Sequence, residues 1–299
     1  MPKITAQLSL PPHYQTNDFF AFHLRDQHNI AEIVEGNLLR KGILWAHSPA
    51  QLLIEIDKDK AHITLDIDNA KNRPSEYDVV ELGKHMLGLR QAVEQFEAEY
   101  LSHPIIGKLI KQQQGLRIYQ SSSPFEALVW AIIGQQISVT AAIAIRRRFI
   151  QATGSKHSSG IWCFPDAQQV SKVTDESLRQ AGFSTGKIIA IRALCHALLS
   201  QQIDLSQPIS NHNVTILTDQ LVSLKGIGPW TVNYALLRGF NYLDGSLHGD
   251  VAVRRNLQSL LGAESQPTAK ETEKWLEAFS PWRALVAAHL WRSQSAAGY

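Results

Sequence analysis

The sequence predicts an α+β fold in which a small N-terminal α+β domain with an antiparallel sheet precedes a mainly α-helical body. Two observations predict this fold. Apolar residues alternate with period two in the first quarter of the chain, which is typical of strands, and this alternation fades after residue 100. Beyond that point, helix start signals and apolar stripes of helical spacing follow one another. At ~150 residues a domain, 299 residues suggest about two domains, or three small ones.

The strand signal is concentrated in residues 42–68. Apolar side chains recur at every second position in 52–56 and again in 63–67, and a polar stretch separates the two segments. This pattern predicts at least a two-stranded antiparallel hairpin. Ile43 and Trp45 extend the pattern upstream and are expected to lengthen the sheet.

Helix signals flank the strands and fill the rest of the chain. Ser123-Pro124-Phe125-Glu126 combines an N-cap serine, a proline at the first helical position and a glutamate three residues after the cap. An apolar stripe follows at helical spacing, so a helix is expected to begin there. The other expected helices lie around 17–34, 76–100, 166–173, 175–182, 186–200, 214–223, 229–239, 251–261, 268–279 and 281–293.

Composition excludes several classes of protein. Apolar residues make up 44% and charged residues 19% of the chain, which excludes a disordered or collagen-like protein. No apolar run approaches the ~18–20 residues that span a bilayer, and the N-terminus lacks a signal-peptide core. Cys163 and Cys195 are the only cysteines, so a four-cysteine zinc site or iron–sulfur cluster is excluded. We expect a soluble, cytoplasmic protein that does not contact a membrane.

Charge is distributed unevenly along the chain. Residues 1–100 carry 10 basic and 15 acidic side chains, whereas residues 101–299 carry 19 basic and 12 acidic ones. This asymmetry suggests a polyanionic partner for the C-terminal two-thirds. An unevenly charged, solvated surface would give the same pattern.

The most informative segment is 221–239. Its first helix ends near Ser223, a tight Gly226-Ile227-Gly228 turn follows, and Pro229 begins a second helix. Outward-pointing amides and the positive end of the second helix suit a phosphate oxygen, and Ile227 is expected to fill the gap between the helices. An ordinary helical hairpin punctuated by glycines is the alternative. The whole pattern, with Thr231, favours a helix-hairpin-helix motif that binds the DNA backbone.

Together with Asp250, which lies 22 residues after Gly228, this motif resembles the helix-hairpin-helix DNA glycosylase superfamily. Within it, the chain is similar to the 3-methyladenine DNA glycosylase II branch in the segments 131–138, 226–234 and 281–291. The resemblance covers nearly the whole chain. It implies an enzyme that binds double-stranded DNA containing damaged bases, flips out alkylated purines of the 3-methyladenine and 7-methylguanine type, and excises them in base excision repair.

Asp250 is the candidate catalytic residue. It precedes an expected helix, so an N-cap is the simplest interpretation of an isolated aspartate. The two roles are compatible, because a helix N-terminus favours a charged carboxylate. Such a carboxylate stabilises the positive charge that develops on the sugar as the glycosidic bond breaks, and it orients water. Relatives tend to have a proline and a second acid before this aspartate, where this chain has His248 and Gly249.

Trp230 occupies the position at which bifunctional members of the superfamily carry a Schiff-base lysine. Without an amine there, water is the expected nucleophile and an intact strand with an abasic site the expected product. The enzyme is therefore expected to be monofunctional.

Four aromatic residues are implied to form the substrate pocket. Trp230 and Tyr234 are four residues apart and share one helix face. Trp291 matches a pocket residue of the branch, and Phe22 is a weaker match. An aromatic box favours cationic rings such as N-alkylated purines. The alternative is that these side chains belong to the hydrophobic core.

Gln135 and Gln136 follow an apolar helix and a glycine, which is a poor place for core residues. The resemblance implies that their loop enters the duplex and fills the space left by the flipped nucleotide. We therefore expect both to contact DNA, as we do Gly226, Ile227, Gly228 and Thr231. The Arg146-Arg147-Arg148 run is interpreted as a solvated helix face and is given no role in the site.

The resemblance also implies a monovalent cation held by the backbone carbonyls of Val222, Leu224 and Ile227. We expect no required cofactor, no iron–sulfur cluster, and a monomer associated with the nucleoid. The expected domains are an N-terminal α+β domain (1–90), a helical domain carrying the catalytic aspartate (91–122 with 230–299), and a helical domain leading into the hairpin (123–229). Two alternatives stay open: a non-catalytic helix-hairpin-helix DNA-binding module, and a related glycosylase for deaminated or oxidised bases.

Overall fold

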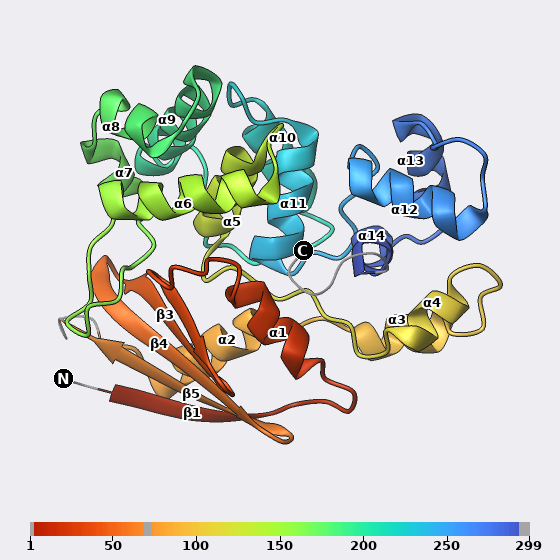
Figure 1. The fold of residues 1–299 in the computed structure, drawn as a ribbon, viewed down its shortest axis with the longest axis horizontal. Coiled ribbons are helices and arrows are strands. Elements are labelled where there is room, and N and C mark those ends of the chain that lie inside the picture. Colours follow the sequence, from red (N-terminus) through yellow and green to blue (C-terminus); the bar gives the residue numbers. More distant parts are fainter. Residues whose placement is uncertain (1–2, 69–72, 293–299) are drawn as a thin grey trace.

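The computed structural model describes residues 3–68 and 73–292. Five strands form one antiparallel sheet in the order β1-β5-β4-β3-β2 (Figure 1). The strands are β1 (Lys3–Ser9), β2 (Glu32–Glu35), β3 (Leu38–Trp45), β4 (Ser48–Asp57) and β5 (Lys60–Ile67). The predicted hairpin is thus β4–β5, and the predicted extension through Ile43 and Trp45 is β3. The α+β fold class expected from the sequence is confirmed.

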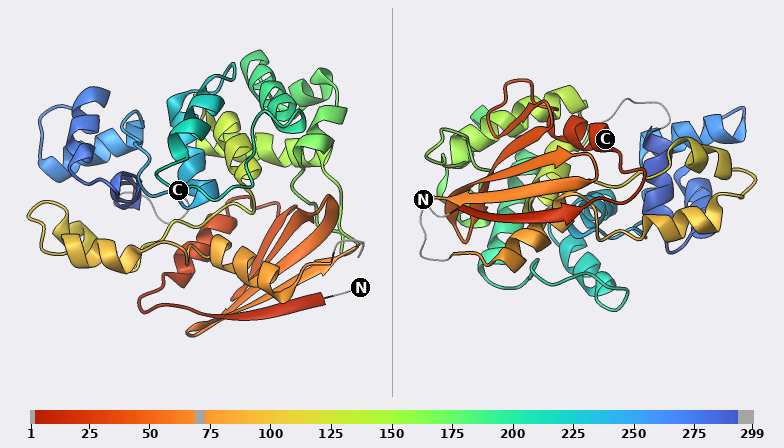
Figure 2. Two further views of the ribbon diagram at one scale, coloured as in Figure 1. Left: turned by 180° about the vertical axis from the view of Figure 1, so that it is seen from behind. Right: turned by 90° about the horizontal axis from the view of Figure 1, so that it is seen from below.

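One face of the sheet is covered by α1 (Thr16–His23) and α2 (Glu76–Met86), as the view from below in Figure 2 shows. The alternating apolar residues of β4 and β5 point to this side, and Leu52, Ile54 and Ile63 are fully buried there. Burying each such side chain contributes about 1.5–3 kcal/mol relative to leaving it in water. The period-two pattern therefore identified the inner face correctly.

Two expected helices are shorter in the structure. The helix expected over 17–34 ends at His23, because the polar segment that follows forms a turn with Asn29 in the left-handed region, and the chain then enters β2. The helix expected over 76–100 is divided into α2 and α3 (Val93–Tyr100). Gly88 between them has φ +68°, and a Cβ there would lie 3.0 Å from the Ile118 carbonyl oxygen.

The rest of the chain is helical, as predicted. Two of its helices, α4 and α6, have no counterpart among the expected segments. The helices are α4 (Gly107–Gln112), α5 (Pro124–Gly134), α6 (Val139–Thr153), α7 (Ala167–Lys172), α8 (Asp175–Ala181), α9 (Thr185–Leu199), α10 (Val214–Val222), α11 (Pro229–Phe240), α12 (Val251–Leu261), α13 (Ala269–Glu277) and α14 (Arg283–Arg292). Ser123 caps α5 as the sequence predicts, accepting a hydrogen bond from the Glu126 amide.

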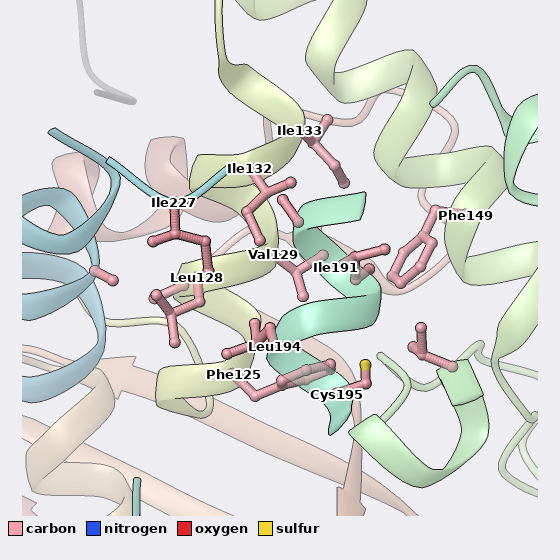
Figure 3. Packing of buried hydrophobic residues seen from close by; sticks show 14 of the residues in the cluster. Phe125, Leu128, Val129, Ile132, Ile133, Phe149, Ile191, Leu194, Cys195 and Ile227 are labelled. Carbon is pink, nitrogen blue, oxygen red and sulfur yellow. The ribbon is translucent and has the colours of Figure 1, made fainter. Parts of the chain in front are cut away.

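Three hydrophobic cores hold the structure together. One lies between the sheet, α1 and α2. A second joins α5, α6, α9 and α11, with Ile227 at its edge (Figure 3). A third joins α3 and α4 to α12–α14, which lie beside them although far away in sequence (Figures 1 and 2). The division into three domains stays a prediction.

Helix α11 contributes to two of these cores. Val232 and Leu236 pack into the second core, whereas Tyr234 and Leu237 pack into the third. A helix fixed on two sides is a rigid support for its side chains. Trp230 and Tyr234 of the candidate site lie on α11, and Tyr234 belongs to the third core as well as to the site.

The Arg146-Arg147-Arg148 run is not the solvated face that the sequence suggests. Arg146 is buried and pairs with Glu32 (3.1 Å) and Glu126 (2.6 Å), so it joins the sheet to the helical body. Arg147 pairs with Asp26, and only Arg148 is exposed. The expectation failed because a charge run on one helix turn has members on different faces.

Candidate active site and DNA-contacting hairpin

The hairpin between α10 and α11 depends on its first glycine for its shape. Gly226 has φ +89°, and a Cβ there would lie 2.9 Å from the Ala190 Cβ. Gly228 has an extended backbone and caps α11, and a Cβ there would meet nothing within 4 Å. Gly226 therefore fits the hairpin against α9, whereas Gly228 leaves room for an approaching phosphate. Ile227 is buried between the helices as predicted.

Asp250 is the N-cap of α12. Its Oδ1 accepts hydrogen bonds from the amides of Ala252 (2.9 Å) and Val253 (3.0 Å). The carboxylate is half-buried rather than enclosed. The N-cap geometry fixes its position and places it at the positive end of the helix dipole.

Two indole groups complete the environment of this carboxylate. Trp230 Nε1 donates to Asp250 Oδ2 (2.9 Å), and Trp291 Nε1 donates to Oδ1 (3.1 Å). Oδ1 therefore accepts three hydrogen bonds and Oδ2 accepts one from the described part of the chain. All four donors are uncharged N–H groups, so they orient the carboxylate without cancelling its negative charge.

The aromatic side chains next to Asp250 form a contiguous row. The rings of Trp230 and Tyr234 are stacked with centroids 5.4 Å apart, and those of Tyr234 and Trp291 are tilted with centroids 6.4 Å apart. Trp291 and Tyr234 are buried, whereas Trp230 is half-buried. The structure thus brings three of the four expected pocket residues together beside the expected catalytic residue.

Comparison with known proteins supports this arrangement. Residues 129–281, just over half of the chain, match the HhH-GPD superfamily of base excision DNA repair proteins. The chain belongs to this superfamily. It is 22% identical over 292 residues to a DNA-3-methyladenine glycosylase of Bacillus subtilis, with 95% of each chain covered.

Solved structures from this superfamily are similar to the chain. One is the 3-methyladenine DNA glycosylase of Archaeoglobus fulgidus, with a TM-score of 0.78, 20% identity, and 96% of this chain and 97% of that one covered. Another is the 3-methyladenine DNA glycosylase Mag1 of Schizosaccharomyces pombe in complex with abasic DNA. Its TM-score is 0.59, with 28% identity, and 69% of this chain and 98% of that one are covered. The branch that the sequence resembles is thus confirmed.

Phe22 lies apart from the aromatic row of this HhH-GPD protein. Its ring contacts within the described residues are with His23 and Tyr119, and it is buried. The guanidinium carbons of Arg25 and Arg238 lie 4.2 and 4.7 Å from its ring centroid. The expected role of Phe22 in the substrate pocket stays a prediction. Two cations already lie against its ring.

The two glutamines of the loop after α5 have different environments. Gln135 Nε2 donates to the Gly226 carbonyl (3.0 Å) and to the Thr231 hydroxyl (2.9 Å), so Gln135 braces the hairpin. Thr231 is itself buried, and its hydroxyl takes part in this brace. Gln136 is exposed, with φ +57°, and is followed by the exposed Ile137. Gln136 and Ile137 are exposed in this loop together with Ser138, which caps α6.

This chain has His248 and Gly249 where relatives tend to have a proline and a second acid. This difference leaves the position of Asp250 undisturbed. His248 Nδ1 lies 2.9 Å from the Ser246 hydroxyl and 3.6 Å from Glu273. A Cβ at Gly249 would meet nothing within 4 Å. The N-cap and the two indole groups therefore position Asp250 without a second acid.

Sequence reasoning missed one residue of this region. Arg238 follows Trp230 and Tyr234 at a spacing of four residues, so all three lie on one face of α11. It is buried next to Phe22. The four-residue spacing was the signal that could have found it.

Proposed function

We propose that this protein is a monofunctional DNA N-glycosylase that flips out and excises alkylated purines and leaves an abasic site for base excision repair. The observation that carries the proposal is Asp250, a half-buried carboxylate fixed by four uncharged N–H donors at a helix N-terminus. Membership of the superfamily and the names of its relatives support the same activity. A non-catalytic DNA-binding module would need no carboxylate held in this way.

The proposed reaction uses Asp250 as an electrostatic partner of the sugar. As the bond between C1′ and the base breaks, its electron pair leaves with the base and positive charge develops on the sugar ring. The Asp250 carboxylate stabilises this charge through Oδ2, the oxygen with fewer hydrogen bonds. A water oxygen then bonds to C1′, and its proton passes to the carboxylate or to solvent.

The hairpin and the loop after α5 are proposed to hold the DNA. The outward amides at Gly226 and Gly228 bind a backbone phosphate, since the start of α11 is a positive helix end. Gln136, with Ile137 beside it, occupies the space that the flipped nucleotide leaves. Gln135 and Thr231 join the hairpin to this loop, so both elements meet the duplex as one unit.

We propose that the chemistry requires no cofactor.

A structural monovalent cation fits the carbonyls of Val222, Leu224 and Ile227, because α10 ends at Val222 and its last carbonyls lack helical donors. The Leu224 carbonyl accepts the Ile227 amide (3.1 Å) and keeps a second lone pair for the ion. When bound, the cation would draw a phosphate toward the hairpin.

Double-stranded DNA containing damaged bases is the proposed partner. We also propose that the protein acts as a monomer on the nucleoid in the cytoplasm. Among the described residues, no helix is both long and apolar enough to cross a bilayer.

Base release tests this function. Duplex DNA containing 7-methylguanine is incubated with the protein, and free bases are identified by mass spectrometry while the strand is followed by gel electrophoresis. We expect free 7-methylguanine and an intact strand with an abasic site. Borohydride should trap no covalent complex, because Trp230 provides no amine. A trapped complex or a cut strand would show a bifunctional enzyme, and absence of any released base would reject the proposal.

A further inference from the structure

Arg238 extends the row of side chains on α11 that begins with Trp230 and Tyr234. It is only 3% exposed. One of its nitrogens, Nη1, donates to the Tyr119 carbonyl oxygen (3.0 Å), and its guanidinium carbon lies 4.7 Å from the centroid of Phe22. Its Nε has no hydrogen-bond partner within the described structure. The guanidinium is therefore held by the Tyr119 carbonyl, the Phe22 ring and a side-chain hydrogen bond with Tyr234.

No carboxylate lies within 4.0 Å of the Arg238 guanidinium in the described part of the chain. Burial lowers the pKa of Arg238 to about 10, so the group still carries its positive charge near neutral pH. Buried arginines are normally paired with an acid. Arg146 shows the usual arrangement, because it contacts both Glu32 and Glu126. The charge of Arg238 thus acts on its surroundings without a nearby counter-charge.

We propose that Arg238 is a specificity-determining residue that favours neutral damaged purines over cationic ones in the site beside Asp250. This inference rests on the proposed function, which places a flipped base against the row of Trp230 and Tyr234. Two positive charges about 8–10 Å apart at an effective dielectric constant of about 20 disfavour each other by roughly 15- to 30-fold. A cationic N-alkylpurine meets this repulsion, whereas a neutral purine does not.

The aromatic ring closest to Arg238 supports the same preference. Phe22 already lies against two guanidinium groups, those of Arg25 and Arg238. The Phe22 ring therefore already makes its cation–π contacts with these two groups, and it adds nothing to the attraction of a cationic base. A neutral purine such as hypoxanthine carries no positive charge and is not repelled by Arg238. Cationic lesions are still excised, because their glycosidic bonds are intrinsically labile.

The test compares two lesions within each variant. Single-turnover excision of hypoxanthine and of 7-methylguanine is measured for the parent, Arg238→Met and Arg238→Lys, and the ratio of the two rates is the readout. This ratio does not depend on how much of a variant is correctly folded. We expect Arg238→Met to lower the hypoxanthine to 7-methylguanine ratio by about tenfold, and Arg238→Lys to keep it within about twofold.

Arg117→Met is the matched control. Arg117 is also buried and also donates to backbone carbonyls, those of Gly88 and Gln91, but it lies outside α11 and, unlike Arg238, is paired with an acid, Glu94. This variant should lose stability and keep the parent's ratio. The inference is overturned if Arg238→Met lowers both rates by one factor, or if the parent releases 7-methylguanine but no neutral purine. A parent that releases neither base would instead reject the proposed function.

Discussion

Two carboxylate sites in this protein hold their charges in opposite ways. Between the sheet and the helical body, Glu32 and Glu126 are buried with Lys41 and Arg146, and each acid contacts both cations. Beside α11, Asp250 is half-buried and receives only neutral N–H groups. The first site is neutralised by its own cations. The second has positioned donors but keeps a net negative charge.

In the proposed mechanism, this difference separates a structural site from a reactive one. The cations beside Glu126 hold its pKa at about 2 despite the opposing effect of burial, so this acid stays ionised and paired with them. A carboxylate whose charge is already neutralised by neighbouring cations can do little to stabilise the positive charge of a substrate. In the proposed reaction, Asp250 is instead oriented for a positive charge that arrives only when the glycosidic bond breaks. Substitutions at the two sites should therefore have different kinds of effect.

Asp250→Asn should give the largest change in activity. Asparagine keeps the shape and caps helices well, so the fold should survive. Loss of the negative charge should lower single-turnover excision of 7-methylguanine by about 10²- to 10³-fold or more. Thermal unfolding measured beside the rate separates the two effects. Excision at the parent rate would require a different catalytic residue.

Glu126→Gln should lower stability and leave activity nearly unchanged, which is the opposite of the result expected for Asp250→Asn. It leaves Lys41 and Arg146 with one buried acid between them, and breaking a buried ion pair costs about 3–5 kcal/mol. Urea unfolding should show this loss, while excision per folded molecule stays near the parent value. Glu81→Gln, which removes the half-buried acid that pairs with Lys84 and Arg90 at the surface, is the control and should cost less than about 1 kcal/mol. A fall in the rate per folded molecule would show that the buried cluster influences catalysis.

Trp230→Phe tests the donors around Asp250. Phenylalanine keeps an aromatic ring next to Tyr234 but removes the hydrogen bond to Oδ2. A hydrogen bond to a charged group is worth about 1.5–3 kcal/mol, so excision should fall roughly 10- to 100-fold if the orientation of Oδ2 matters. Binding to abasic DNA should change little. An unchanged rate would mean that Trp230 acts through its ring alone.

The buried cluster should also be sensitive to acid through His23, whose Nδ1 lies 2.9 Å from Glu32 Oε1. Burial lowers the pKa of His23 to about 4, below its usual 6.5. The unfolded state therefore takes up a proton first, and stability is lost as the pH falls from about 6.5 toward 4. At pH 5 this loss is about 2 kcal/mol for His23. Comparing urea unfolding at pH 7.5 and pH 5.0, we expect His23→Gln to lose less stability than the parent, and equal losses would contradict this.

Local patterns were sufficient to predict much of the fold. Strand alternation, the Ser123 cap and the glycine hairpin depend on neighbours in sequence, and the structure confirms them. The burial of Arg146 could not be predicted, because its acidic partner Glu32 comes from β2, more than a hundred residues earlier. Contacts between distant segments are set by packing and leave no local pattern.

Contacts between distant segments also limited what the sequence could predict about the candidate site. Asp250 and its spacing from the hairpin are visible in the sequence, and the resemblance implied the aromatic residues around it. The donation of both indole N–H groups to Asp250 depends on α11 and α14 meeting at the start of α12. Likewise, the brace from Gln135 to Thr231 joins residues 96 positions apart. The sequence identified most of the candidate residues, and the structure identified their partners.

The most direct test of the charge on Asp250 is a binding comparison. One duplex carries a pyrrolidine in place of the damaged nucleoside, which is cationic when protonated, and the other carries a neutral tetrahydrofuran at the same position. The parent should bind the pyrrolidine duplex more tightly by about 100-fold or more, as expected for a mimic of the transition state. Asp250→Asn should lose most of this preference while still binding the tetrahydrofuran duplex. An equal preference in both proteins would contradict the proposal that Asp250 stabilises the positive charge on the sugar.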